Sequence, residues 1–128
     1  GAETTMSMPS PDGRVMHAEM RIGNSMVFVS DEFPDMAPKI RAPESTGGTV
    51  TGSIFLYVPD VDAVVKRAVD AGAKVTMPVA DMFWGDRFGK VADPFGHHWG
   101  IATHKEDLTP QEMKKRGDEF HKKMAQQK

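Results

Sequence analysis

The sequence predicts an α+β fold in which short antiparallel strands outnumber the helices. Two observations support this prediction. Residues 6–31 contain short runs of strand-forming side chains separated by turn residues, which is typical of a strand meander. Residues 53–103 fit the order strand, helix, strand, strand, strand, and the helix is recognisable from the spacing of its apolar residues. We therefore expect antiparallel meanders together with one βαβββ unit.

The first three strands are predicted from alternation and from turn chemistry. A short strand is expected at residues 3–8, and Asp12-Gly13 then supplies a tight turn. Residues 15–22 alternate between a polar face and an apolar face. Residues 26–29 form another apolar strand after the turn at Gly23. We expect the three strands to form a meander.

Residues 31–52 have the composition of a loop. They hold three prolines and three glycines and show no periodic pattern. We interpret this segment as a solvated linker between two strand-rich regions. The alternative, a loop that covers a binding site, stays open.

The helix of the second region is predicted from a single apolar stripe. Its members follow the spacing i, i+3, i+4, i+7, i+8: Val61, Val64, Val65, Ala68 and Val69. Asp60 is a candidate N-cap, and Gly72 suits the left-handed conformation after the last turn. Because valine is a mediocre helix former, the helix should depend on packing against a sheet.

A second helix is expected at the end of the chain. Thr109-Pro110-Gln111-Glu112 fits a capping box with proline at the first helical position. Met113, Phe120 and Met124 form a narrow apolar stripe, and Gly117 is expected to interrupt the helix.

Composition limits the classes of protein that fit. The chain has 128 residues, a formal net charge of −2 and no cysteine. The absence of cysteine excludes disulfides, thiolate metal sites and a cysteine nucleophile. The charge argues against a general nucleic-acid binder, and no apolar run approaches the roughly 20 residues that cross a bilayer. No signal peptide is visible, so a cytoplasmic protein without nucleic-acid or membrane partners is expected.

The order and spacing of these elements resemble a known superfamily. A strand leads into Val58-Pro-Asp-Val-Asp-Ala63, a helix ends at Ala71-Gly-Ala73, and Asp93-Pro-Phe-Gly-His97 precedes the last strand. This pattern resembles the second βαβββ module of the vicinal oxygen chelate superfamily, which includes glyoxalase I, extradiol dioxygenases and the bleomycin-resistance proteins. Residues 78–104 are similar to its PhnB-like branch.

The resemblance implies glyoxalase-like βαβββ modules that form an open, cup-shaped sheet. Residues 1–34 would be an incomplete first module, without its N-terminal strand and helix. Residues 35–52 would be a linker loop, residues 53–104 the second module, and residues 105–128 the C-terminal helix. With about seven of the eight strands of a closed cup, the chain is expected to form a homodimer.

The resemblance also implies a metal site whose usual ligands are not matched here. In the superfamily, His and Glu side chains hold a divalent metal in the cup. The second module has Ser53 and Gly100 at the corresponding positions. No cofactor is therefore expected, with a divalent metal as the alternative; the weak candidate ligands are His17, Glu19 and Glu32.

Aromatic residues supply the candidate ligand-binding pocket. An aromatic loop surrounds Gly85, and the strand at residues 53–58 has a face that could line a cavity. The candidate pocket residues are Phe55, Tyr57, Phe83, Trp84, Arg87 and Trp99. Arg87 would bind an anionic group. The alternative is that these rings only cap the core.

Two classes of function fit this reading. One is a glyoxalase-like or PhnB-like protein that binds a small molecule in the cup between paired modules, as the bleomycin-resistance proteins do. The other is a metal-dependent lyase, isomerase or dioxygenase. The residues do not decide whether the chain is an enzyme, and they identify neither a catalytic residue nor a substrate.

Overall fold

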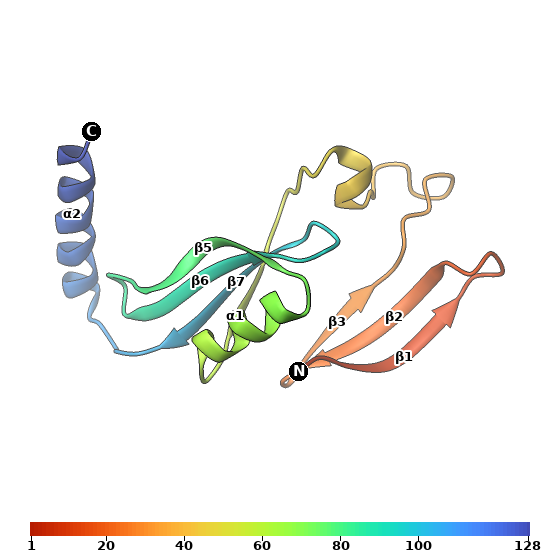
Figure 1. Cartoon of the computed structure of the whole chain (residues 1–128), viewed down its shortest axis with the longest axis horizontal. Helices are drawn as coiled ribbons and strands as arrows, with labels where there is room; N and C mark the ends of the chain where they lie inside the picture. Colours follow the sequence, from red (N-terminus) through yellow and green to blue (C-terminus); the bar gives the residue numbers. More distant parts are fainter. The chain divides into compact units, whose positions relative to one another are not determined.

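The computed structural model describes all 128 residues and divides them into two compact units, residues 1–47 and residues 48–128 (Figure 1). The first unit is a three-stranded sheet with its turns and an extended loop. The second is a four-stranded sheet with two helices. Together they form the mixed α+β, open-sheet architecture that the sequence predicts.

The first unit is the expected meander. Its strands are β1 (Glu3–Pro9), β2 (Val15–Ile22) and β3 (Ser25–Val29). They pair antiparallel in the order β1-β2-β3. Directly paired residues such as Glu19 and Phe28 share one face of the sheet.

Polar side chains organise the turns of this unit. The carboxylate of Asp12 accepts hydrogen bonds from the backbone N–H of Arg14 (3.1 Å) and from its guanidinium (2.8 Å). The carboxylate of Asp31 accepts from the backbone N–H of Val15 at 2.6 Å. These bonds close the β1–β2 turn and attach the end of β3 to the start of β2.

The loop after β3 is more ordered than its composition indicates. It contains a 3-10 helix, η1 (Pro43–Thr46), whose Pro43 is buried. Glu32 receives hydrogen bonds from the guanidinium of Arg41 (3.1 Å), the backbone N–H of Ala42 (2.6 Å) and the hydroxyl of Ser45 (2.6 Å). One carboxylate therefore holds the start of η1.

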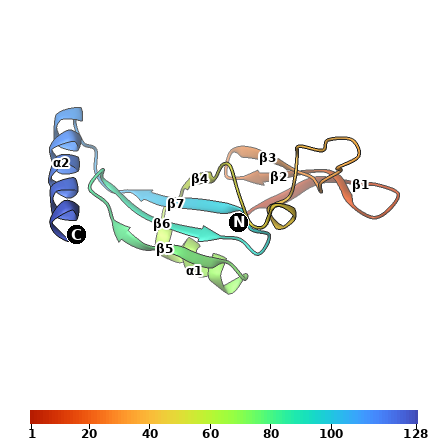
Figure 2. The ribbon, with the colours of Figure 1, turned by 90° about the horizontal axis from the view of Figure 1, so that it is seen from above.

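The second unit has the βαβββ order that the sequence predicts. Its elements are β4 (Ile54–Tyr57), α1 (Val61–Asp70), β5 (Lys74–Asp81), β6 (Asp86–Ala92), β7 (His98–His104) and α2 (Pro110–Gln126). The sheet order is β4-β7-β6-β5, and β4 is parallel to β7. In Figure 2, α1 lies along one face of this sheet, and α2 stands near the turn between β5 and β6.

The core of the second unit lies between α1 and this covered face. Buried side chains meet there: Val61, Val65, Ala73, Val91 and Ile101. Thr103 links the two layers, because its hydroxyl accepts from the N–H of Val61 (2.8 Å) and donates to the carbonyl of Val58 (2.9 Å). As predicted, Asp60 caps α1 by accepting from the N–H of Ala63 at 3.1 Å, and Gly72 has a positive φ of 107°.

Three details differ from the sequence-based expectations or add to them. Val69, assigned to the buried stripe, is 42% exposed, because it lies at the last turn of α1, where the stripe leaves the sheet. β5 continues to Asp81, past Pro78, since proline is tolerated on the edge strand of a sheet.

The third difference concerns α2. Gly117 does not interrupt this helix, which is continuous and begins with the predicted capping box at Thr109. Gly117 is buried, and a β-carbon there would lie 3.3 Å from Cε2 of Phe83. The glycine therefore marks the place where α2 approaches the β5–β6 turn most closely. Neither helix is both long and apolar enough to cross a membrane.

Candidate functional site

The face of the second sheet that α1 does not cover carries the candidate site. Directly paired residues share a face, so the strand register places the side chains of this open face in rows across the sheet. One row is Met77, Lys90, Gly100 and Phe55; the next is Ala80, Phe88, Ala102 and Tyr57; the last is Asp86 and His104.

Aromatic rings form a continuous series on this face. Phe55 stacks on Phe88 with ring centroids 5.5 Å apart, and it lies 5.1 Å from Tyr57. Trp84 meets Phe88 at 5.7 Å, and Phe83 continues the series at 5.2 Å from Trp84. Phe55 and Tyr57 remain 48% and 64% exposed. We call Phe55, Tyr57, Trp84 and Phe88 the aromatic panel.

Asp86 is the polar centre of the panel. Its carboxylate is only 3% exposed, yet it has three partners. The hydroxyl of Tyr57 donates to Oδ2 at 2.8 Å, the indole N–H of Trp84 donates to the same oxygen at 3.1 Å, and Nδ1 of His104 lies 2.9 Å from Oδ1. A buried carboxylate needs such partners, because an unpaired charge away from water is costly.

His104 joins this centre to the surface. Its Nε2 lies 2.7 Å from Oδ1 of Asp107, so each ring nitrogen faces a carboxylate. Asp107 first and Asp86 second raise the pKa of His104, because both favour the imidazolium form. The hydrogen bond to Asp86 raises the pKa of Tyr57, because it stabilises the protonated phenol. The carboxylates of Asp107 and Asp86 therefore favour the charged form of His104, and that of Asp86 favours the neutral form of Tyr57.

Neither Asp86 nor His104 is among the site residues predicted from the sequence. A signal for them existed in the turn Asp93-Pro-Phe-Gly-His97, whose ends are joined by a hydrogen bond from the N–H of Asp93 to the carbonyl of His97 at 2.8 Å. Counting outward from that turn pairs Asp86 with His104, as the register has it.

The six predicted pocket residues lie in different surroundings. Phe55, Tyr57 and Trp84 belong to the aromatic panel. Phe83 packs against Phe120 of α2, with ring centroids 5.3 Å apart. Trp99 faces the α1 side, next to the core, and its indole N–H donates to Asp93 at 3.0 Å.

Arg87 also lies on the α1 side of the sheet. It donates to both carboxylate oxygens of Asp62 (2.7 and 3.0 Å) and to Asp81 at 3.2 Å. These carboxylates raise the pKa of Arg87 still further above its already high value. The anion that Arg87 binds in this structure is thus the carboxylate of Asp62 in the first turn of α1, where a negative charge also offsets the positive end of the helix dipole.

The weak metal candidates lie in the first unit and do not converge. Nε2 of His17 is 3.0 Å from Oε1 of Glu19, and the imidazole ring meets Phe28 at 5.0 Å. Glu32 instead holds the loop at Ala42. No three His, Asp or Glu side chains gather in a geometry that would hold a metal ion.

The position that carries a metal ligand in the superfamily also has a different environment here. Gly100 is buried, and a β-carbon there would lie 2.9 Å from Cδ2 of Phe55 and 3.1 Å from Cε2 of Phe88. The rings of the panel fill the space that a ligand side chain would occupy. The residues present therefore do not fit the metal site that the fold implies.

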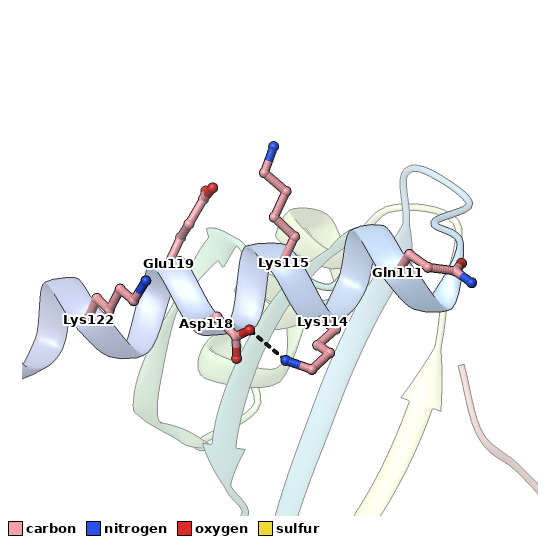
Figure 3. Close-up of a pocket in the computed structure, with 6 residues that line it drawn as sticks. All are labelled: Gln111, Lys114, Lys115, Asp118, Glu119 and Lys122. Carbon is pink, nitrogen blue, oxygen red and sulfur yellow. Dashed lines mark hydrogen bonds and ion pairs between the residues drawn. The ribbon is translucent and has the colours of Figure 1, made fainter.

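Two hollows are present in the second unit. One, of about 270 Å³, lies at the end of the open face beside Gly100 and is lined by Ser53, Lys90 and His98 among others. The other, of about 400 Å³, runs along the exposed surface of α2. Figure 3 shows its charged side chains spread along one helix, with Lys114 paired to Asp118 at 2.7 Å. The second hollow lacks an opposing wall, so we place the candidate site at the first.

The fold and this open face define a class of protein: a βαβββ sheet whose uncovered face carries an aromatic panel. A family model for the glyoxalase/bleomycin resistance protein/dioxygenase superfamily matches residues 3–101. The chain belongs to this superfamily.

Its relatives in sequence include uncharacterized mycobacterial proteins. One from Mycobacterium bovis is 44% identical over 107 residues, covering 83% of this chain and 70% of that protein. The equivalent match in Mycobacterium tuberculosis H37Rv is also 44% identical over 83% of this chain but covers 62% of that protein. The chain thus spans roughly two thirds of the length of these relatives.

Solved structures share the fold. A gene product of Arabidopsis thaliana is 30% identical with a TM-score of 0.60, and the match covers 80% of this chain and 77% of that one. A PhnB protein from Bacillus cereus has a TM-score of 0.54 at 16% identity, covering 80% and 79%. TnmS3, an antibiotic binding protein from Streptomyces sp. CB03234, has a TM-score of 0.56 at 24% identity, covering 82% and 77%.

Proposed function

We propose that this protein binds a small molecule with a flat apolar part on the aromatic panel, and that it does so without a metal ion. The observation that carries the proposal is the stacking of Phe55 on Phe88 above Gly100. Where a metal-dependent member of the superfamily needs a ligand side chain, this sheet presents rings. Exposed aromatic surface with a few fixed polar groups is the usual lining of a small-molecule site.

The polar centre beneath the panel supports binding rather than chemistry. The carboxylate of Asp86 accepts hydrogen bonds from Tyr57 and Trp84 and pairs with His104, so both of its oxygens are occupied. These bonds fix the orientation of the Tyr57 and Trp84 rings and so preorganise the panel. That TnmS3 binds an antibiotic is a precedent at the level of the fold alone.

A thermal-shift experiment tests the proposal, since a ligand that binds only the folded state raises the melting temperature by mass action. The probes are neutral bicyclic amides, such as 2-naphthamide and indole-3-carboxamide, with and without EDTA. We expect a concentration-dependent rise that EDTA does not change. The proposal is contradicted if none of these amides binds.

A matched pair of variants locates the binding. Phe55→Ala should weaken the binding of the amide probes several-fold, because it removes an exposed ring of the panel. Phe95→Ala is the control, since Phe95 is 69% exposed but lies in the turn between β6 and β7. Equal affinities for both variants would place the ligand elsewhere.

The second candidate function is a metal-dependent lyase, isomerase or dioxygenase of the superfamily. Only membership in the family favours it. A melting-temperature rise with Mn²⁺, Ni²⁺ or Zn²⁺ alone, reversed by EDTA, would favour this candidate over the first.

We also propose that the chain forms a homodimer in the cytoplasm. The exposed rings of Phe55 and Tyr57 support the presence of a second subunit, because apolar patches of this kind often form interfaces. Light scattering across a dilution series tests the dimer, and a monomer of 14.1 kDa at micromolar concentration contradicts it. Cell fractionation tests the location.

A further inference from the structure

The hollow beside Gly100 is lined by a positively charged side chain, whereas a site for a metal cation usually contains carboxylates. Lys90 is directly paired with Gly100 across β6 and β7, so its side chain stands on the open face next to that glycine. His98 precedes Gly100 by two residues on β7 and therefore points to the same face. Lys90, His98 and Ser53 line the hollow, and no Asp or Glu does.

The ammonium group of Lys90 has no carboxylate partner. Its one recorded contact is with the ring of Phe88, whose centroid lies 5.9 Å away. An uncompensated positive charge at this place repels a divalent cation and attracts an anion.

Donors of the right chemistry surround the hollow. A lysine supplies a point charge with three N–H donors, and a serine hydroxyl and an imidazole N–H supply directed hydrogen bonds. Charge-assisted bonds of this kind are the stronger class of hydrogen bond for a carboxylate or phosphate-like group.

The hollow is continuous with the aromatic panel. Gly100 lines the hollow, and the rings of Phe55 and Phe88 lie immediately above the position of its missing β-carbon. Since Lys90, Gly100 and Phe55 stand in one row of the sheet, a ligand whose flat part lies on Phe55 has its edge directed toward Lys90.

We propose that this hollow is an oxyanion subsite: Lys90, with His98 and Ser53, binds a carboxylate or phosphate-like group of the small molecule directly, at the place where metal-dependent relatives hold their cation. The inference rests on the proposed function and names the chemical class of its ligand, an aromatic oxyanion. The selectivity of the site comes from a lysine fixed in the sheet.

Two matched probes test the subsite separately from the panel. 2-Naphthoate and 2-naphthamide have the same ring and nearly the same shape, but only the first is an anion. Calorimetry with and without EDTA should give the same affinity for 2-naphthoate, about tenfold higher than that for 2-naphthamide, which corresponds to one charge-assisted contact. The preference should shrink as salt is raised.

Two lysine variants identify the residue responsible. Lys90→Met keeps the apolar stem and removes the charge, so it should bring the affinity for 2-naphthoate down to that for 2-naphthamide. Lys115→Met makes the same change in net charge on α2, where Lys115 projects into solvent (Figure 3), and should leave the preference intact. Both lysines are exposed, so both variants should fold.

The outcomes separate the two proposals. Equal affinities for both probes, or a preference that survives in Lys90→Met, overturn the oxyanion subsite while the panel stands. Binding of neither probe overturns the panel and the subsite together. Binding of 2-naphthoate that disappears with EDTA overturns the subsite in favour of a metal.

Discussion

Each of the two units of this chain contains one sheet, antiparallel throughout in the first unit and mixed in the second, and the two are stabilised differently. The second unit buries an apolar layer between α1 and its sheet, with Val61 and Ile101 only 1% and 3% exposed. In the first unit, every residue of β1 is exposed, and Phe28 of β3 is 64% exposed. Its order comes from carboxylates in turns, chiefly those of Asp12, Asp31 and Glu32.

The comparison shows that strands can pair in a defined register without forming a buried core. Alternation and turn residues suffice to set the register of the first sheet. A buried core also needs a second layer against one face, which α1 supplies in the second unit. The candidate site depends on the same arrangement, because the aromatic panel lies on the face of the sheet that α1 does not cover.

The largest expected effect is on the core of the second unit. Ile101→Ala should lower the free energy of unfolding by about 3–4 kcal/mol, because it leaves a cavity under α1. Phe28→Ala in the first unit should cost less than about 1 kcal/mol, since its ring is mostly in water. Urea denaturation followed by circular dichroism measures both. Similar costs would mean that the first unit has a core of comparable strength.

A somewhat smaller effect is expected at the polar centre of the panel. Asp86→Ala should destabilise the second unit by about 2–3 kcal/mol, because Tyr57 and Trp84 lose their shared acceptor. Asp81→Ala is the control, since its side chain is 77% exposed. Thermal unfolding measures the difference in stability between the two variants. Equal stability would mean that the hydrogen bonds of Asp86 do not hold these rings in place.

In the first unit, the expected effect is on local order. Glu32→Gln should increase the rate of hydrogen exchange in residues 41–46, because the amide keeps the shape but loses the charge-assisted bonds. The second unit should be unaffected. Unchanged exchange near η1 would show that Pro43, rather than Glu32, holds the loop.

The same carboxylate gives the loop a pH dependence. Arg41, Ser45 and the N–H of Ala42 lower the pKa of Glu32 to about 2 from its ordinary 4.5. The contribution of Glu32 to stability is therefore complete above pH 4.5 and is lost as the pH falls toward 2. Between these values the protection factors of residues 41–46, which correct for the intrinsic pH dependence of exchange, should fall in the wild type and stay constant in Glu32→Gln.

The smallest expected effect is on the titration of His104. Its folded pKa lies above 6.5, so its contribution to stability is complete below 6.5 and is lost as the pH rises through the folded value. Asp107→Asn should lower that pKa, because Asp107 is the main cause of the shift. NMR titration of the imidazole measures it, and Asp118→Asn is a control on α2.

The sequence predicted the fold in much detail because local signals agreed with the packing. The stripe through Val61 and Val65, the Asp60 cap and the capping box at Thr109 all appear in the structure. Gly117 was misjudged because helix propensity describes an isolated helix, whereas here glycine allows close packing on Phe83.

The site was harder to predict because it depends on which face each residue takes across several strands. Phe55, Tyr57 and Trp84 were chosen for their chemistry and share the open face. Trp99 and Arg87 were chosen in the same way and lie on the helix side. Composition names candidate residues, but only the register separates the two sets.

The parallel pairing of β4 with β7 has a consequence for biosynthesis. The hydroxyl of Thr103 binds the carbonyl of Val58, 45 residues earlier in the chain. A nascent polypeptide therefore exposes β4, with Phe55 and Tyr57, until nearly the whole second unit has been translated. Because such non-local pairing slows folding and leaves an edge unpaired in the meantime, the segment around Phe55 can complete its pairing only after β7 has been synthesised.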